Sequence, residues 1–152
     1  EGMHRLALDP EALGRLKAEP DLIPNAVEEM IRVASPVRHF MRTVQSDTEV
    51  AGQPIAAGDQ VMLNYTAANL DPGVFDDPLR FDIARPNADK HIAFGFGIHF
   101  CLGAQLARME LRSLYRHLVP RLEHVELAGE PATIKAAFVS GHKRLPIRYR
   151  LT

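Results

Sequence analysis

The chain has a single cysteine and no tryptophan among its 152 residues, and its formal net charge is only −1. One cysteine excludes an internal disulfide framework and leaves no pair of thiolates for a structural zinc site. A net charge this small gives no field that would favour nucleic acid or an acidic membrane surface. No apolar run approaches the roughly 18 residues that cross a bilayer, and no basic-then-apolar segment opens the chain. We therefore expect a cytoplasmic protein with no membrane anchor and no nucleic-acid partner.

Three segments have the pattern of helices. Residues 10–18 begin at Asp9-Pro10, and proline suits the first turn of a helix. A stronger helix is expected from near Pro24 through Ala34, because apolar residues recur there at the spacing of a buried stripe. A third helix is predicted over 102–118, with its apolar stripe at Ala107, Leu111, Leu114 and Leu118.

Strands and irregular segments occupy the rest of the chain. Short runs of Val, Thr, Phe and Ile over 37–63 favour strands and hairpins, and a further hairpin is expected around 138–146. Residues 71–90 show neither the helical nor the strand period of apolar residues, yet Phe75 and Phe81 within them are typical of a packed loop rather than a disordered one. The predicted class is mixed α+β, mainly α.

The first ten residues, EGMHRLALDP, read as the last turns of a helix rather than as a chain start. No N-cap signal precedes the apolar positions Met3, Leu6 and Leu8. We expect the chain to begin within a helix, as a fragment of a longer protein would.

The lone thiol, Cys101, follows a glycine- and aromatic-rich loop and lies at the predicted N-terminal edge of the 102–118 helix. Unpaired amides and the positive end of the helix dipole favour a thiolate there. Gly103 would let backbone amides approach the sulfur, and an apolar wall is offered by Phe94, Phe96 and Phe100. Such a thiolate is a ligand for a soft metal, and the alternative is an inert buried cysteine.

The spacing Phe94-x-x-Gly97-x-x-x-Cys101-x-Gly103 resembles the haem-binding signature of the cytochrome P450 family. In that family a single cysteine thiolate ligates the iron of haem b. The resemblance therefore implies that Cys101 is the metal ligand and that Phe94, Gly97 and Gly103 belong to the haem-binding loop.

Glu29-x-x-Arg32 resembles the ExxR motif of the family's K helix, and its i, i+3 spacing places both residues on one helical face. The segment FDDPLRF resembles the meander in which an arginine completes an ion network with that motif, which implies Arg80 as the third member. We expect this network to hold the 71–90 loop beneath the haem. An ordinary exposed pair of Glu28 with Arg32 is the alternative reading.

The segment ASPVRHFMRT resembles the strand that passes the haem edge after the K helix. This likeness implies that Arg42 contacts a haem propionate through a charge-assisted bond. His99 occupies the position where many members place a propionate-binding side chain. His91 either approaches the haem edge or caps its loop, and both readings stay open.

The same resemblance implies which residues meet substrate and redox partner. Four apolar residues are expected to line the substrate pocket, which suits a hydrophobic substrate: Val37, Phe40, Phe138 and Val139. Arg108 and Arg112 are either solvated helix charges or part of the face where a ferredoxin docks.

The resemblance covers all 152 residues but only the C-terminal part of a P450: the end of the I helix, the J and K helices, small β sheets, the meander, the cysteine loop, the L helix and a β hairpin. We expect 1–152 to be the C-terminal haem-binding part of a single P450 domain whose N-terminal part is absent, with the I helix ending at about residues 1–8. The implied parent is a bacterial haem-thiolate monooxygenase. It would hydroxylate a sterol, lipid or terpenoid-like substrate with O₂ and electrons from a ferredoxin and its reductase.

Two alternatives remain. The chain alone could be a truncated, non-catalytic haem-binding fragment, and we expect it to be inactive by itself. A cysteine-nucleophile hydrolase would use His99 as the base for Cys101. Residues at i and i+2 of an extended stretch point to opposite faces, which argues against that pair.

Overall fold

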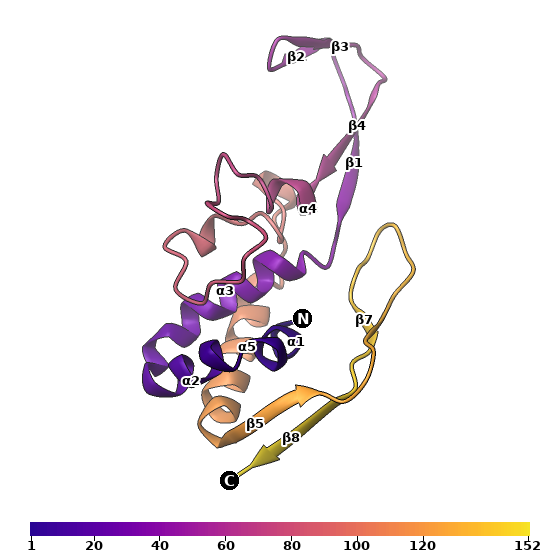
Figure 1. The fold of residues 1–152 in the computed structure, drawn as a ribbon. Coiled ribbons are helices and arrows are strands. Elements are labelled where there is room, and N and C mark those ends of the chain that lie inside the picture. Colours follow the sequence, from indigo (N-terminus) through magenta and orange to yellow (C-terminus); the bar gives the residue numbers. More distant parts are fainter.

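The computed structural model describes all 152 residues, and in it the helices gather into one body from which paired strands extend (Figure 1). The helices are α1 (Gly2–Leu8), α2 (Pro10–Ala18), α3 (Ile23–Ala34), α4 (Tyr65–Ala68) and α5 (Ala104–Leu118). Short 3₁₀ turns lie at Pro20–Leu22, Ala88–Lys90, Gly97–His99 and Val119–Arg121. No helix is both long and apolar enough to cross a bilayer.

The strands form four antiparallel pairs rather than one continuous sheet. Their bounds are β1 (His39–Thr43), β2 (Thr48–Val50), β3 (Gln53–Ile55), β4 (Gln60–Asn64), β5 (Leu122–Leu127), β6 (Ala132–Thr133), β7 (His142–Arg144) and β8 (Ile147–Leu151). The pairs are β1–β4, β2–β3, β5–β8 and β6–β7. In Figure 1 the first two pairs form one arm and the last two form another. The predicted mixed class is confirmed.

Local chemistry explains where α2 begins and where α3 ends. Asp9 caps α2, because its Oδ1 accepts a hydrogen bond of 2.9 Å from the Ala12 N–H, and Pro10 occupies the first helical position. At the C-terminal end of α3, Ser35 adopts a left-handed conformation with φ 35°, and its hydroxyl donates to the Arg32 carbonyl. Pro36 then prevents continuation of the helix.

The apolar core lies among α1, α2, α3, α5 and β5. Its most deeply buried members are Leu6, Leu16, Ile23, Val27, Val119 and Leu122. Burial of each such side chain contributes about 1.5–3 kcal/mol to folding. The stripe expected on α3 is confirmed, because the Ile23, Val27 and Ile31 positions are all buried.

The stripe predicted on α5 is wrong in one position. Leu114 is 50% exposed, whereas Ala104 and Tyr115 are the buried residues of this helix. The large aromatic ring of Tyr115 takes the core-facing position next to Leu114, and burial raises the pKa of its hydroxyl to about 12. Leu114 therefore turns outward, whereas the Ala107, Leu111 and Leu118 positions remain part-buried, as expected for the predicted stripe.

The C-terminal hairpin is longer than the sequence suggested. Its arms are β5 with β6 and β7 with β8, and residues 134–141 form the connection. A bridge between Val37 and Val139 ties this connection to the segment that follows α3. The hairpin thereby reaches the same region as β1.

The irregular 71–90 loop contains no α-helix or strand, as predicted, and it is packed against the helical body. Phe75 is almost completely buried, with the guanidinium of Arg32 5.0 Å from its ring centroid. Phe81 is half-buried. The contacts that hold this loop are described with the site.

Candidate functional site

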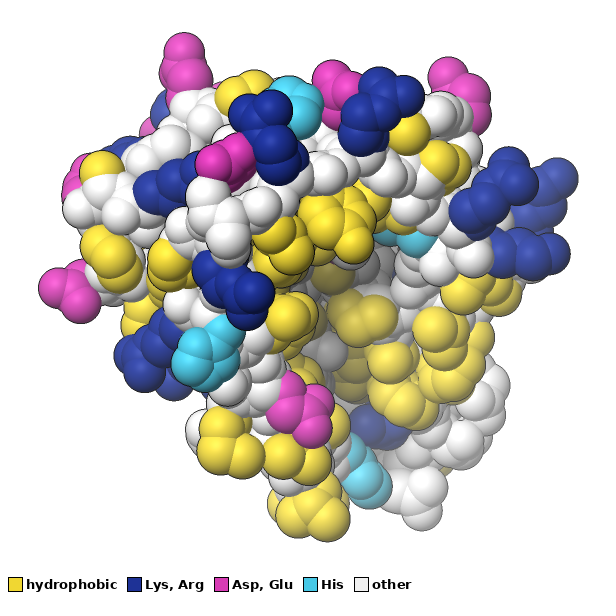
Figure 2. Space-filling model, turned by 90° about the horizontal axis from the view of Figure 1, so that it is seen from below, with side chains coloured by type: hydrophobic (Ala, Val, Ile, Leu, Met, Phe, Trp, Pro, Cys, Tyr) yellow, Lys and Arg dark blue, Asp and Glu magenta, His cyan; other side chains and the backbone are white.

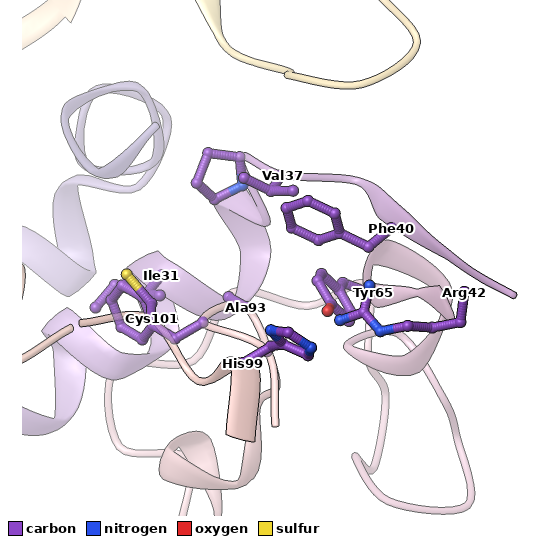
Figure 3. A pocket seen from close by; sticks show the side chains of 11 residues that line it. Ile31, Val37, Phe40, Arg42, Tyr65, Ala93, His99 and Cys101 are labelled. Carbon is purple, nitrogen blue, oxygen red and sulfur yellow. The ribbon is translucent and has the colours of Figure 1, made fainter. Parts of the chain in front are cut away.

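A cavity of about 530 Å³ lies where the end of α3, β1, the start of α4 and the loop before α5 meet. We call it the thiol cavity, because Cys101 is one of its lining residues (Figure 3). Its walls are mainly apolar and include Ile31, Val37, Phe40, Tyr65, Ala93 and Phe94. The side chains of Arg42 and His99 supply the positive and potentially positive groups.

The loop that carries Cys101 turns tightly because two glycines take up left-handed conformations. Gly95 has φ 76° and Gly97 has φ 71°, values that other residues rarely adopt. A Cβ on Gly95 would also lie only 3.3 Å from the Tyr65 hydroxyl oxygen. The loop is closed by the Cys101 N–H, which donates to the Phe94 carbonyl at 2.9 Å.

Cys101 lies two residues before Gly103, the N-cap of α5, so this helix begins at Ala104 rather than at the predicted residue 102; the Cys101 thiol is exposed. The reading of a buried cysteine is therefore wrong. The N–H groups of Leu102 and Gly103 donate to no backbone carbonyl, as expected at the start of a helix. A Cβ on Gly103 would lie 3.9 Å from the Cys101 sulfur, an ordinary contact distance.

A basic end of the cavity lies away from the thiol. In Figure 3 the Cys101 sulfur is at one side of the view and Arg42 is beside Tyr65 at the other, with the His99 ring between them. The Arg42 guanidinium donates to the Met41 carbonyl at 2.9 Å and lies 5.7 Å from the Phe40 ring centroid. Its remaining donors form no hydrogen bond and are free to bind an anionic group.

This arrangement fits a haem group in its donor chemistry. A thiolate is a soft ligand of the kind that holds haem iron, and only one is present. Apolar walls suit the macrocycle, while an arginine and a histidine suit its carboxylates. No hydrogen bond joins the His99 ring to the Cys101 thiol, so the nucleophile–base pair of a cysteine hydrolase is not formed.

Behind the cavity, Glu29, Arg32 and Arg85 form a buried ion network. Arg32 binds Glu29 through two bonds of 2.7 and 2.8 Å, and neither side chain is exposed. Arg32 also donates to the Asn69 and Pro78 carbonyls. The exposed pair of Glu28 with Arg32 does not form, since the Arg32 guanidinium bonds Glu29 and backbone carbonyls and does not reach the Glu28 carboxylate.

The third member of this network is Arg85, which corrects the prediction of Arg80. Arg85 is 5% exposed, and its Nε lies 3.1 Å from Glu29 Oε2. It also donates to the carbonyls of Asp76, Asp77 and Arg80. The side chain of Arg80 is exposed, and only its carbonyl takes part, as an acceptor from Arg32 and Arg85. Both arginines lie in the same aperiodic loop, and only its tertiary path decides which one turns inward.

A second cluster, the Glu28 cluster, consists of Glu28, His91, Arg108 and Arg112. The Glu28 carboxylate accepts bonds from Arg108 at 2.9 Å and from Arg112 at 2.8 Å, and it lies 3.2 Å from His91 Nε2. Burial alone would raise the pKa of Glu28. Hydrogen bonds from His91 and Arg108, with their charges, outweigh burial and lower this pKa to about 2. The cluster joins α3 to α5 with a carboxylate that is ionised at neutral pH.

The Glu28 cluster decides between the open readings for His91 and Arg108. His91 does not line the thiol cavity, because its buried ring faces Glu28 and its Nδ1 accepts from the Ala93 N–H. It therefore caps its loop rather than approaching the haem edge. Arg108 is only 15% exposed and lies over the Phe94 ring at 4.8 Å, so it is no solvated helix charge. Arg112 keeps 38% exposure beside it.

The residues expected to meet substrate come together at one side of the cavity. Val37 and Phe40 line it, and Phe138 packs edge-on against Phe40 with ring centroids 5.3 Å apart. Phe138 and Val139 do not line the cavity themselves. They lie next to it, because Val139 forms an antiparallel β-bridge with Val37, which does line it.

Sequence reasoning missed Tyr65 and Arg85. Tyr65 is buried at the start of α4 and lines the cavity. The sequence signal that could have found it is its position directly after β4, the strand that pairs with β1. No local signal separates Arg85 from Arg80.

The fold and the site together define a haem-thiolate protein, and comparison with known proteins gives the family. The family model "Cytochrome P450" matches residues 18–147, so the chain belongs to the cytochrome P450 family, whose members are haem-thiolate iron enzymes. The predicted P450 fold is confirmed by the crystal structure of CYP108D1 from Novosphingobium aromaticivorans, which superposes with a TM-score of 0.94 at 51% identity. That match covers 99% of this chain and 36% of the other.

Three curated bacterial relatives show similar coverage. Cytochrome P450-terp of a Pseudomonas species is 47% identical over 95% of this chain and 33% of that protein. Steroid C26-monooxygenase of Mycolicibacterium smegmatis is 43% identical over 96% and 37%. Linalool 8-monooxygenase of Pseudomonas putida is 40% identical over 93% and 35%. The chain spans about a third of the length of these relatives.

Proposed function

We propose that the chain is the haem-binding C-terminal part of a P450 monooxygenase that hydroxylates a hydrophobic sterol, lipid or terpenoid-like substrate. The electrons would come from a ferredoxin and its reductase, and O₂ would supply the oxygen atom. One observation carries the proposal: the exposed Cys101 thiol faces an apolar cavity whose far end bears Arg42 and His99. The names of the steroid and linalool monooxygenases support this substrate class.

Cys101 would hold the haem iron as a thiolate. The bound haem would supply the chemistry of O₂ activation and oxygen transfer, which no side chain supplies. The unpaired N–H groups of Leu102 and Gly103 would stabilise the negative charge on the sulfur. Phe94, another lining residue of the cavity, would add to the apolar surroundings of the group.

Arg42 and His99 would orient the group by binding its carboxylates at the basic end of the cavity. Arg42 provides free guanidinium donors for a charge-assisted bond. His99 is exposed and can turn toward the same group. Each is a binding residue, not a proton donor for the reaction.

Val37 and Phe40 would form the apolar wall met by the substrate, with Phe138 and Val139 behind them. Phe138 and Val139 remain 46% and 40% exposed, which leaves apolar surface for a ligand. Arg112, with its part-exposed guanidinium, and the adjoining Arg108 would lie on the ferredoxin side.

Residues 1–152 alone are expected to be inactive. Figure 2 shows a face on which hydrophobic side chains line an open hollow, and large side chains such as Phe96, Ile98 and Leu102 are also exposed. Surfaces of this kind are normally covered by further protein or by a partner.

The experiment is turnover by the longest form of the protein that its gene encodes. The haem-loaded protein is incubated with NAD(P)H, a ferredoxin with its reductase and panels of sterols, fatty acids and terpenoids under ¹⁸O₂. We expect one class to give a product that carries one ¹⁸O atom, detected by mass spectrometry. Haem-loaded, reducible protein that oxygenates no member of any panel would contradict the proposal.

A further inference from the structure

Outside the thiol cavity, Glu1, His4 and His142 bring one carboxylate and two imidazoles together. One ligand atom from each residue lies within 4.8 Å of the other two. Glu1 and His4 are at the start of α1, whereas His142 is the first residue of β7. In Figure 1 the N-terminal end of α1 lies on the side of the helical body that faces β7. Two elements far apart in sequence therefore contribute to one cluster.

The three side chains contact one another directly. His142 Nε2 lies 3.1 Å from Glu1 Oε2, and the rings of His4 and His142 meet edge-on with centroids 4.7 Å apart. The other carboxylate oxygen of Glu1 accepts a bond of 2.8 Å from Arg5. Arg5 thus orients the Glu1 carboxylate and leaves Oε2 pointing at the histidines, as outer partners of metal ligands do.

The ring nitrogens of this cluster lack hydrogen bonds. His4 Nδ1 and both nitrogens of His142 are buried atoms without a hydrogen-bond partner, although the His142 side chain as a whole is 13% exposed. His142 Nε2 is close enough to Glu1 for an ion pair but is not aligned as a hydrogen-bond donor to it. Buried polar atoms nearly always have a partner, and leaving one unpaired costs free energy. A ligand that accepts lone pairs from several of these atoms would remove that cost.

We propose that Glu1, His4 and His142 form a binding site for one divalent transition-metal cation of the Zn²⁺ type. Two imidazole nitrogens and one carboxylate oxygen are the ligand types that Zn²⁺ prefers, with water in the fourth position. Mg²⁺ and Ca²⁺ are disfavoured because they take oxygen ligands. Ligand atoms around Zn²⁺ stand roughly 3.3 Å apart, so small side-chain movements of about 1 Å close the site.

The electrostatics favour this use. Burial, with a smaller contribution from the neighbouring His142, lowers the pKa of His4 even though the Glu1 charge acts in the opposite direction.

A bound cation would fasten α1 to the C-terminal hairpin. Residues 134–141 connect β6 to β7, and they include Phe138, which packs against Phe40 of the thiol cavity. Binding would thus stabilise the folded protein by mass action and would restrain the segment beside the cavity.

The test is Zn²⁺ binding to the longest, haem-loaded form of the protein after treatment with a chelator. Haem ligation at Cys101 would mask that thiol, which would otherwise bind Zn²⁺. Isothermal titration calorimetry and elemental analysis after dialysis are expected to give one tightly bound Zn²⁺ and a raised melting temperature. His4→Ala and His142→Ala are each expected to weaken binding by at least about 100-fold, since even loss of an outer partner costs about 10- to 100-fold.

His124→Ala is the matched control, because His124 is also next to a glutamate, Glu126, but is half-exposed and belongs to no group of three ligands. Its Zn²⁺ affinity is expected to equal that of the wild type. His142→Asn provides a second variant of similar polarity, and the haem content and circular dichroism of every variant verify folding. Absence of tight Zn²⁺ binding in the wild type, or unchanged affinity in folded His4 and His142 variants, would overturn the proposal.

Discussion

Replacement of Arg85 by alanine is expected to destabilise the protein far more than replacement of Arg80. The Arg85 guanidinium is buried against Glu29 and donates to three carbonyls of the 71–90 loop. Arg85→Ala removes all of these donors at once and leaves the Asp76 carbonyl without a partner, while the Asp77 and Arg80 carbonyls keep bonds from the Arg80 N–H and from Arg32. Arg80 lies in the same loop but has an exposed side chain, so Arg80→Ala is a matched control.

The expected loss of folding free energy follows from the burial of the Arg85–Glu29 ion pair. Breaking a buried ion pair by removing one partner costs about 3–5 kcal/mol, because the remaining charge stays desolvated. Here Arg32 still binds Glu29 in the variant, which places the expected loss near the lower end, at about 3 kcal/mol. A surface substitution such as Arg80→Ala is expected to change stability by less than about 0.5 kcal/mol.

The assay is urea unfolding of the haem-loaded protein, followed by circular dichroism and by haem absorbance in parallel. The midpoint for Arg85→Ala is expected to fall clearly, with lower haem content after purification, whereas Arg80→Ala follows the wild type. Equal midpoints for both variants would refute the assignment of Arg85 to the network. A larger loss for Arg80→Ala would restore the original prediction from sequence.

Three further outcomes are expected. Glu28 has a pKa lowered from 4.5 to about 2, so its contribution of about 3 kcal/mol is present above pH 4.5 and is lost as the pH falls to about 2. Acid unfolding curves of Glu28→Gln are expected to be flatter over this range, and identical slopes would contradict the cluster. Arg42→Ala is expected to speed haem transfer to apomyoglobin by about 10- to 100-fold, as loss of a charged hydrogen bond costs about 1.5–3 kcal/mol, while Arg42→Lys loses less. Phe40→Ala is expected to raise the Kd of a hydrophobic substrate roughly fivefold in spectral titrations, through loss of about 1 kcal/mol of aromatic packing. An unchanged transfer rate or Kd would remove that residue from the site.

Regular elements and the cysteine loop could be predicted because their signals are local. The Asp9-Pro10 start of α2, the end of α3 just before Pro36 and the glycines around Cys101 each act within a few residues. Hydrophobic period and turn chemistry depend on the same short range.

Contacts between distant segments could not be predicted in this way. The choice of Arg85 over Arg80 depends on how an aperiodic loop crosses α3. The roles of His91 and Arg108 depend on Glu28, which lies 63 and 80 residues away in the chain. Leu114 and Tyr115 are adjacent, and the packing of α5 on α3 decides which of them is buried. Prediction of the Glu28 cluster would have required knowledge of how α5 packs on α3.

The central claim, that Cys101 ligates haem iron, is tested most directly by the absorption spectrum of the reduced, CO-bound protein. The wild type is expected to show the red-shifted band of a thiolate-ligated haem, and Cys101→Ala is expected to lose it. Cys101→His is expected to give at best a haem protein with the band of a nitrogen ligand. Retention of the thiolate band in the alanine variant, or its absence from haem-loaded wild-type protein, would contradict the account.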